Sequence, residues 1–144
     1  GSLALRRAHV TGLFPTPAEC AAIEVDVREI LAEAPAVCAL RAQHLVGLGG
    51  VLSSTSRLHA LLYLDEPQRC IAAAALAPMI AMLGSGRPLE ERDTALLLRA
   101  APDRLHNIVP GMIIARVLAE TFAAEDITCS DGGVREGYIR AEIL

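Results

Sequence analysis

The segment best suited to bind a charged group is a glycine-rich stretch near the middle of the chain, which contains Gly47, Gly49 and Gly50. It lies between an apolar run typical of a strand and a helical pattern. Glycines at such a junction let backbone N–H groups approach an anion closely, and Ser53 adds a hydroxyl donor. Leu52 occupies the third glycine position of the dinucleotide fingerprint, so that fingerprint is absent. Two interpretations remain open: a plain tight turn and a phosphate cradle.

Arg104 is a second candidate, because it precedes Asn107, which is expected to begin a helix. Asparagine is a favourable N-cap, and Pro110 would fall in the first turn, where its missing N–H costs little. A cation beside the free N–H groups of a helix start attracts an anion. The alternative role for such an arginine is a surface ion pair. Arg104 alone does not decide between these roles.

The third candidate is the turn Arg135, Glu136 and Gly137, which follows paired glycines near the end of the chain. Its charges could project into a cleft. They could instead form an internal ion pair that locks the turn, and the sequence favours this structural role.

Metal and nucleophile chemistry have little support in the sequence. The cysteines form no C-x-x-C pair and the histidines no i,i+4 pair, so we expect no metal site. We expect reduced, mostly buried thiols, and histidines at the surface or at strand edges. No nucleophile stands beside a matched base. The residues concerned are Cys20, Cys38, Cys70, Cys129, His9, His44, His59 and His106.

The composition narrows the function further. The 144 residues are 53% hydrophobic with a formal charge of -4, which fits one globular domain, residues 1–144. All basic residues are arginine, and the absence of lysine excludes Schiff-base enzymes and lysine-tipped phosphate loops. The acidic balance and the few aromatic residues argue against a nucleic-acid partner.

The most apolar run, residues 70–83, is too short to span a membrane and is expected to be a core helix. We therefore expect a cytoplasmic protein without a membrane partner.

The first part of the chain is predicted to alternate between strands and a helix. Apolar and polar residues partly alternate over residues 3–11, which is typical of a half-buried strand. Thr16 and Glu19 form a capping box, and the helix that it starts is expected to end near Pro35. Residues 44–48 then predict a strand that leads through the paired glycines into another helix.

The rest of the chain is predicted to be mostly helical from residue 67, with breaks at Pro78, at residues 84–86 and at Pro102. One helix covers residues 89–100, another runs from Asn107 through residue 121, and a last strand covers 126–129. This order indicates an α/β fold with a small mixed sheet and several helices. Three strands cover little of the apolar surface, so one sheet face is expected to meet another domain.

In this order the segments resemble the exopolyphosphatase and guanosine pentaphosphate phosphohydrolase family, within the actin-like phosphotransfer superfamily. The match is to the second lobe of the family's phosphatase domain and extends over almost the whole chain. The R-E-G turn after the last strand is its most specific part. The segments that carry the resemblance are residues 2–11, Pro15 to Leu31, His44 to Gly50, Arg104 to Gly111 and Ile127 to Gly137.

The resemblance implies an actin-like (ribonuclease H-like) fold in which polyphosphate or guanosine pentaphosphate binds between two lobes. Gly47, Gly49, Gly50 and Ser53 are then expected to line the cleft, and Arg104 to contact a distal phosphate. A divalent metal, magnesium (Mg2+), is expected in the complete enzyme and none in this lobe alone. The first phosphate loop and the catalytic glutamate would belong to the first lobe, before residue 1. The isolated lobe is therefore expected to be inactive.

Val51 departs from the family pattern, which usually has threonine after the paired glycines. The change removes one hydroxyl, for which backbone donors and Ser53 are expected to substitute in part. It also supports a second hypothesis, a non-catalytic interaction or regulatory domain derived from an actin-like fold. A lobe of a sugar or acetate kinase is a third hypothesis, although such proteins as a rule lack the R-E-G ending. Exposed apolar surface could also drive the formation of a homodimer.

Overall fold

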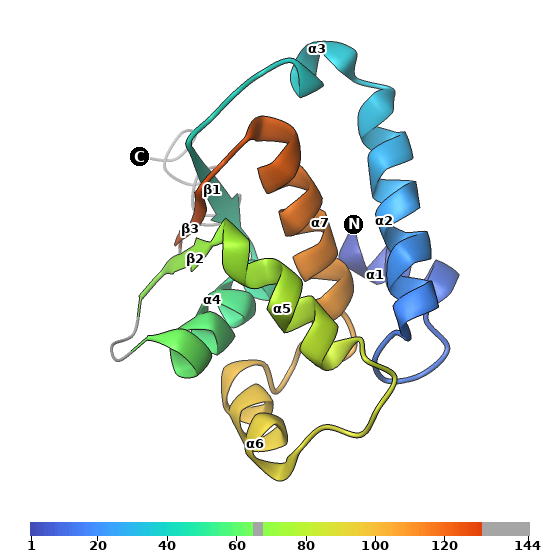
Figure 1. The fold of residues 1–144 in the computed structure, drawn as a ribbon, viewed down its shortest axis with the longest axis vertical. Coiled ribbons are helices and arrows are strands. Elements are labelled where there is room, and N and C mark those ends of the chain that lie inside the picture. Colours follow the sequence, from blue (N-terminus) through green and yellow to red (C-terminus); the bar gives the residue numbers. More distant parts are fainter. Residues whose placement is uncertain (65–67, 131–144) are drawn as a thin grey trace, which may run out of the picture.

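The computed structural model describes residues 1–64 and 68–130, which form seven helices and a three-stranded sheet (Figure 1). The elements in chain order are α1 (Ser2–His9), α2 (Pro17–Ala32), α3 (Pro35–Cys38), β1 (His44–Leu48), α4 (Gly50–Tyr63), β2 (Cys70–Ala72), α5 (Ala73–Leu83), α6 (Glu91–Ala100), α7 (Ile108–Phe122) and β3 (Asp126–Ser130).

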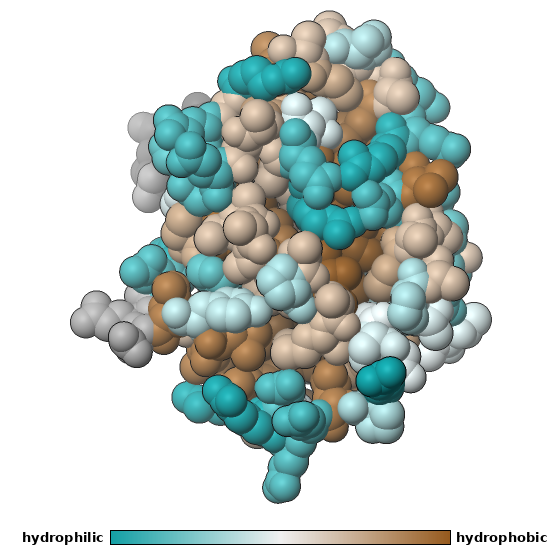
Figure 2. Space-filling view, in the orientation of Figure 1, coloured by the Kyte–Doolittle hydropathy of each residue, from teal (hydrophilic) through white to brown (hydrophobic). Residues whose placement is uncertain are grey.

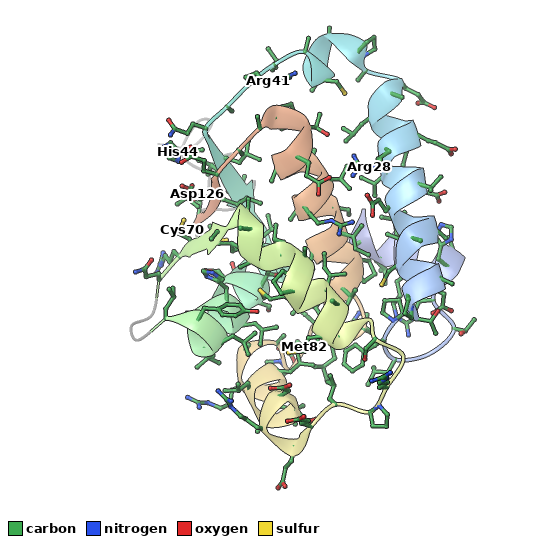
Figure 3. All side chains as sticks on the ribbon, viewed as in Figure 1. Arg28, Arg41, His44, Cys70, Met82 and Asp126 are labelled. Atoms are coloured by element: carbon green, nitrogen blue, oxygen red, sulfur yellow. The ribbon has the colours of Figure 1, made fainter. Side chains whose placement is uncertain are left out.

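The sheet has the strand order β1-β3-β2 and is mixed, as the sequence predicts. β1 and β3 run parallel, with His44 opposite Asp126, whereas β2 is antiparallel to β3. The His44 imidazole lies 2.8 Å from the Asp126 carboxylate, and Figure 3 shows both residues at the same end of the sheet, where β1 and β3 begin. Parallel strands need a long crossover. Helices α4 to α7 provide it between β1 and β3.

Helix α7 is the centre of the core and contacts α1, α2, α4 and α5 (Figure 1). It is apolar around most of its circumference, which is typical of a helix that is buried on several sides. Its fully buried side chains pack with residues from the surrounding elements. The largest fully buried side chains of α7 and of the elements around it are Ile23, Leu58, Ile71, Leu76, Met79, Leu83, Leu97, Ile108, Val109, Met112, Ile113 and Val117.

The capping box at the start of α2 is confirmed. The Thr16 backbone N–H donates to Glu19 Oε2 at 2.7 Å, and the Glu19 N–H donates to Thr16 Oγ1 at 3.3 Å. These bonds satisfy donors that a helix start otherwise leaves free. The Thr16 N–H, followed by that of Thr11, lowers the pKa of Glu19. The helix ends at Ala32, close to the predicted end near Pro35.

The strand predicted over residues 3–11 is wrong, because residues 2–9 form α1. In α1 only Leu5 is buried, and Arg6 and Arg7 interrupt the alternation that a strand would need. Basic residues in the last turn are favourable beside a helix carboxyl end. Contacts with α2 and α7 supply the remaining stabilisation, which no local pattern reveals.

The core helix predicted over residues 70–83 is correct only in its second part. Cys70–Ala72 forms β2, and α5 begins at Ala73. A short apolar run has the same appearance in a strand and in a buried helix, so periodicity could not separate them. The predicted break at Pro78 is also wrong, since α5 continues through this exposed residue while Met79 and Ile80 bury the opposite side.

The later boundaries lie close to the predicted ones. α6 begins at Glu91 instead of residue 89, and α7 ends one residue beyond the predicted end.

No helix among residues 1–64 and 68–130 is long and apolar enough to cross a membrane.

The expectation that all histidines lie at the surface or at a strand edge is wrong for His59. This side chain is 5% exposed in α4, and its ring centroid lies 5.6 Å from that of Tyr63. Burial lowers the pKa of His59.

All four cysteines are free thiols; Cys129 is buried and the other three are partly buried.

Candidate anion-binding site

The glycine-rich segment forms the junction between β1 and the first turn of α4. Gly49 is the N-cap and has φ 108°, a conformation that glycine adopts without strain. The Ser53 N–H donates to the Gly49 carbonyl at 3.1 Å, which closes the first intrahelical hydrogen bond. The preceding helical amides, those of Gly50, Val51 and Leu52, therefore have no partner within the helix. Gly49 and Gly50 are exposed, so this start of α4 is open to solvent.

The Arg104 guanidinium lies against this helix start. A β-carbon built on Gly50 would be 3.1 Å from Arg104 Nε and 3.2 Å from its Nη2. Arg104 is exposed, and its side chain has no hydrogen bond or ion pair within the described ranges. The structure thus brings together the two candidates that the sequence identified separately. A permanent cation and the positive end of a helix dipole face the same space.

The hydroxyls that follow the glycines differ in availability. Ser54 Oγ accepts from Arg57 Nη2 at 3.1 Å, and Thr55 Oγ1 donates to the Val51 carbonyl at 2.9 Å. Both residues are buried, whereas Ser53 is partly exposed, and no hydrogen bond engages its hydroxyl in the described part of the chain. Ser53 is therefore the hydroxyl best placed to assist an anion at this loop.

Gly47 occupies a different environment from the other two glycines. It lies inside β1, is buried, and pairs in register with Cys129. A β-carbon on it would be 2.5 Å from Leu52 Cδ1 and 3.1 Å from Ile127 Cγ2. Its position is explained by close packing between β1 and α4, and its predicted contact with phosphate has no separate support from the geometry.

Val51 points toward α7. A β-carbon on Gly111 would collide with Val51 Cγ1, so the first turn of α4 packs tightly against the first turn of α7. Sequence reasoning missed this role of Gly111. The signal for it is a glycine inside a helix, which costs about 1 kcal/mol relative to alanine and so indicates a packing reason.

Asn107 is the N-cap of α7, as predicted, but its side chain makes no capping hydrogen bond. An N-cap side chain accepts from the second or third helical N–H, and the third residue here is Pro110, which has none. Asn107 is 6% exposed and its Oδ1 has no partner in the described ranges. The sequence therefore predicted the N-cap position correctly, but the capping hydrogen bond expected of an asparagine side chain is not formed.

Other chemistry has little support at the described residues. Burial raises the pKa of the Cys20, Cys70 and Cys129 thiols, which disfavours the reactive thiolate. No three histidine, cysteine or acidic side chains among residues 1–64 and 68–130 are grouped so that they could hold a metal ion. The predicted cleft or turn residues Arg135, Glu136 and Gly137 lie outside the described residues.

Comparison with known proteins identifies relatives of the whole chain. The family model described as Ppx/GppA phosphatase family matches residues 1–144. No curated protein sequence matches the chain.

Three solved structures of Ppx/GppA proteins from Aquifex aeolicus share the fold. The family member described in a structural characterisation of the family has a TM-score of 0.77 at 23% identity, and the match covers 100% of this chain and 46% of that one. A second Aquifex structure gives 0.74 at 21% identity, covering 99% and 47%. The type II variant gives 0.70 at 21% identity, covering 100% and 47%.

The present chain therefore spans slightly less than half the length of these structures. The small mixed sheet and surrounding helices of the present chain match these structures, as the sequence resemblance predicted. With the family model matching every residue, the chain belongs to the Ppx/GppA phosphatase family.

Proposed function

We propose that this chain is the second lobe of a two-lobe phosphatase, and that its α4 start and Arg104 hold phosphate groups of polyphosphate or guanosine pentaphosphate. The observation that carries this proposal is the position of the Arg104 guanidinium over Gly50, at a helix start whose first amides have no partner within the helix; among the described residues Arg104 has no hydrogen bond or ion pair. The family match and the partial coverage of the Aquifex structures support a lobe of a larger enzyme.

The physical basis is the convergence of two positive groups on an open surface. A helix start offers N–H donors and a partial positive charge, which favours phosphate. Arginine adds a planar set of donors that matches phosphate oxygens. Because Gly50 has no side chain, an oxygen can approach its amide and the guanidinium together. Ser53 is the further donor in this arrangement.

Such a clamp fits hydrolysis of a phosphoanhydride bond. Phosphoryl transfer depends mainly on positioning and on the neutralisation of charge, and little on covalent chemistry by the protein. The amides of α4 and Arg104 would hold phosphates of the chain while the first lobe orients the attacking water. Magnesium belongs to the complete enzyme in this proposal. The described residues form no group of ligands that fits it, so we derive no step through the metal.

The placement is tested by titrating the 144-residue chain with tripolyphosphate and following backbone amides by NMR. We expect chemical-shift changes at Gly49, Gly50 and Ser53. The dissociation constant for tripolyphosphate should be about tenfold higher in Arg104→Gln, because this is the usual effect of losing one charge-assisted hydrogen bond. The matched control is Arg92→Gln, which removes an equal charge from exposed α6. Shifts confined to other surfaces, or equal effects of the two variants, would contradict the placement.

The proposal also predicts that the isolated lobe releases no phosphate. We expect no inorganic phosphate above background when the chain is incubated with polyphosphate and magnesium, because the water-orienting lobe is missing. Turnover that disappears in Arg104→Gln would refute this division of labour between the lobes.

A non-catalytic domain is the second candidate function, and Val51 is the observation that favours it. Its side chain packs against Gly111 instead of offering a hydroxyl to the loop. A correctly folded chain that binds neither tripolyphosphate nor guanosine pentaphosphate would favour this candidate. In either case the four free thiols fit a cytoplasmic protein.

A further inference from the structure

Arg104 belongs to a turn, residues 101–107, that joins α6 to α7. Figure 1 shows α6 at one end of the molecule, and among the described elements it packs mainly against α4. Within the turn the Arg104 N–H donates to the Ala101 carbonyl at 3.1 Å, and the Asn107 N–H donates to the Arg104 carbonyl at 3.1 Å. These bonds fix the shape of the turn. The place of Arg104 over Gly50 therefore depends on how the end of α6 is held against α4.

The Arg57 side chain of α4 contacts the end of α6 directly. Its Nε donates at 3.0 Å to the carbonyl of Ala100, the last residue of α6, and its Nη2 donates to the Ser54 hydroxyl at 3.1 Å. Carbonyls in the last turn of a helix lack a partner within the helix, and a cation beside them is favourable. Within the described ranges no carboxylate pairs with Arg57. Its guanidinium is therefore held by two neutral acceptors, one on each helix.

These contacts form a closed path that begins and ends at Gly50. Ser54 lies one turn after Gly50 on the same face of α4. Arg57 joins Ser54 to Ala100, and both of these acceptor residues are buried in packed parts of the molecule. Four residues after Ala100 the chain reaches Arg104, whose guanidinium lies against Gly50. Arg57 is thus the polar link between the helix start and the turn that carries its arginine.

We propose that Arg57 is a positioning residue of the anion site: it ties the end of α6 to α4 and so holds the Arg104 guanidinium over Gly50. Its effect on phosphate binding rests on the proposed function, whereas its effect on the place of Arg104 is measurable without a ligand. Arginine has many rotamers, and fixing them costs conformational entropy. A turn that is already held in place reduces the ordering that remains when phosphate binds.

Two other roles of Arg57 lead to different expectations. As a cap of α6 alone, it would contribute to stability and leave binding at α4 unchanged. As a direct phosphate ligand, it would act through its charge, which lysine also carries. A positioning residue acts through two hydrogen bonds from one planar guanidinium, a geometry that the lysine ammonium does not reproduce. It also acts only through Arg104.

The test measures tripolyphosphate binding by calorimetry in Arg57→Lys, with and without Arg104→Gln. We expect Arg57→Lys to weaken binding about threefold to tenfold, and by no more than Arg104→Gln does. The double variant should bind as Arg104→Gln alone does, within about twofold, because Arg57 has no effect once the guanidinium of residue 104 is gone. The matched control Arg99→Lys, in the exposed last turn of α6, should leave binding unchanged.

NMR of the ligand-free chain gives an independent readout. We expect a nuclear Overhauser contact between the Arg104 side chain and the Gly50 α-protons in the wild type and in Arg99→Lys, and its loss in Arg57→Lys. Ser54→Ala removes one of the two acceptors without adding bulk, so it should weaken this contact in part. It takes the place of Arg57→Lys in both measurements if that variant does not fold.

The outcomes separate this proposal from the proposed function. A wild-type chain that does not bind tripolyphosphate would refute the proposed function, and the Overhauser contact would then decide the role of Arg57 by itself. An unchanged contact in Arg57→Lys would overturn the proposal. Full affinity in Arg57→Lys would also overturn it, as would an equal weakening by Arg57→Lys in the presence and absence of Arg104.

Discussion

Two regions of the molecule use arginine in opposite ways. Between α2 and α7, Arg28 Nη2 lies 2.6 Å from Glu24 Oε1 and 2.5 Å from Glu120 Oε2, while Arg116 also contacts Glu24. Figure 3 shows Arg28 between the two helices, and Figure 2 shows hydrophilic atoms gathered over the same region. At the start of α4, Arg104 has no such carboxylate partner among the described residues.

The difference separates a structural role from a binding role. In the α2–α7 network two cations face two carboxylates, so its charge is satisfied internally and it holds the helices together. Arg104 lies beside Gly50 in the first turn of α4, and the positive end of a helix cannot neutralise an arginine. A chain with an overall formal charge of -4 therefore still has a local site suited to an anion.

The same contrast applies to two glycines on neighbouring helices. Gly111 faces a methyl group of Val51, which is held in the packed junction of α4 and α7. Gly50 faces the end of the Arg104 side chain, which can move aside. Substitution at Gly111 should therefore change mainly stability, and substitution at Gly50 mainly binding.

The largest effect is expected for Gly111→Ala. The added methyl group overlaps Val51, and overpacking of this kind costs about 1–3 kcal/mol. Urea denaturation followed by circular dichroism measures the loss. Gly111→Ala combined with Val51→Ala should recover part of it, because the collision is removed. A Gly111→Ala variant as stable as the wild type would contradict the close helix contact.

A smaller effect is expected for Glu24→Gln, which removes the carboxylate that Arg28 and Arg116 share. We expect a loss of about 1 kcal/mol, since the pairs are only partly screened from solvent. The control Glu29→Gln lies on the exposed side of α2 and should be nearly neutral in the same denaturation assay. Equal stabilities of the two variants would mean that the network contributes nothing.

The pH dependence of stability examines the same network. The Arg28 hydrogen bond lowers the pKa of Glu24 below its ordinary value of 4.5. The Glu24 carboxylate therefore contributes fully to the unfolding free energy above pH 4.5, its pKa in the unfolded chain. This contribution is lost as the pH falls through the lower pKa that Glu24 has in the folded protein. Unfolding free energies measured between about pH 6 and pH 3 should fall less steeply in Glu24→Gln. Parallel curves would show that Glu24 is not the group responsible.

The smallest change in stability is expected for Gly50→Ala. The new methyl group displaces the movable end of Arg104, and alanine is a better helix former than glycine, so the unfolding free energy should change by less than about 1 kcal/mol. Tripolyphosphate should nevertheless bind about threefold to tenfold more weakly, because the arginine and the amide no longer share one oxygen. Isothermal calorimetry measures this, and unchanged affinity would argue against the clamp.

Predictions from the sequence succeeded where a few neighbouring residues decide the structure. The Thr16 capping box and the β1–glycine–α4 junction depend on residues that are close together in the sequence. Both could therefore be predicted from the order of the residues. The failures were α1 and β2, whose conformations depend on packing against α7 and on pairing with β3. Those partners lie far away in the sequence, and local patterns do not encode the choice.

The candidate site divides in the same way. The glycine junction between β1 and α4 could be predicted from the sequence, because the strand, the paired glycines and the helix start follow one another directly in the chain. The sequence left open whether this junction is a plain turn or a phosphate cradle. Three further features follow from the packing of distant elements: Arg104 lies over Gly50, Val51 packs against Gly111, and Gly47 is buried. Each of these depends on how α4, α7 and the sheet come together, since side chains distant in sequence meet only after the helices have packed.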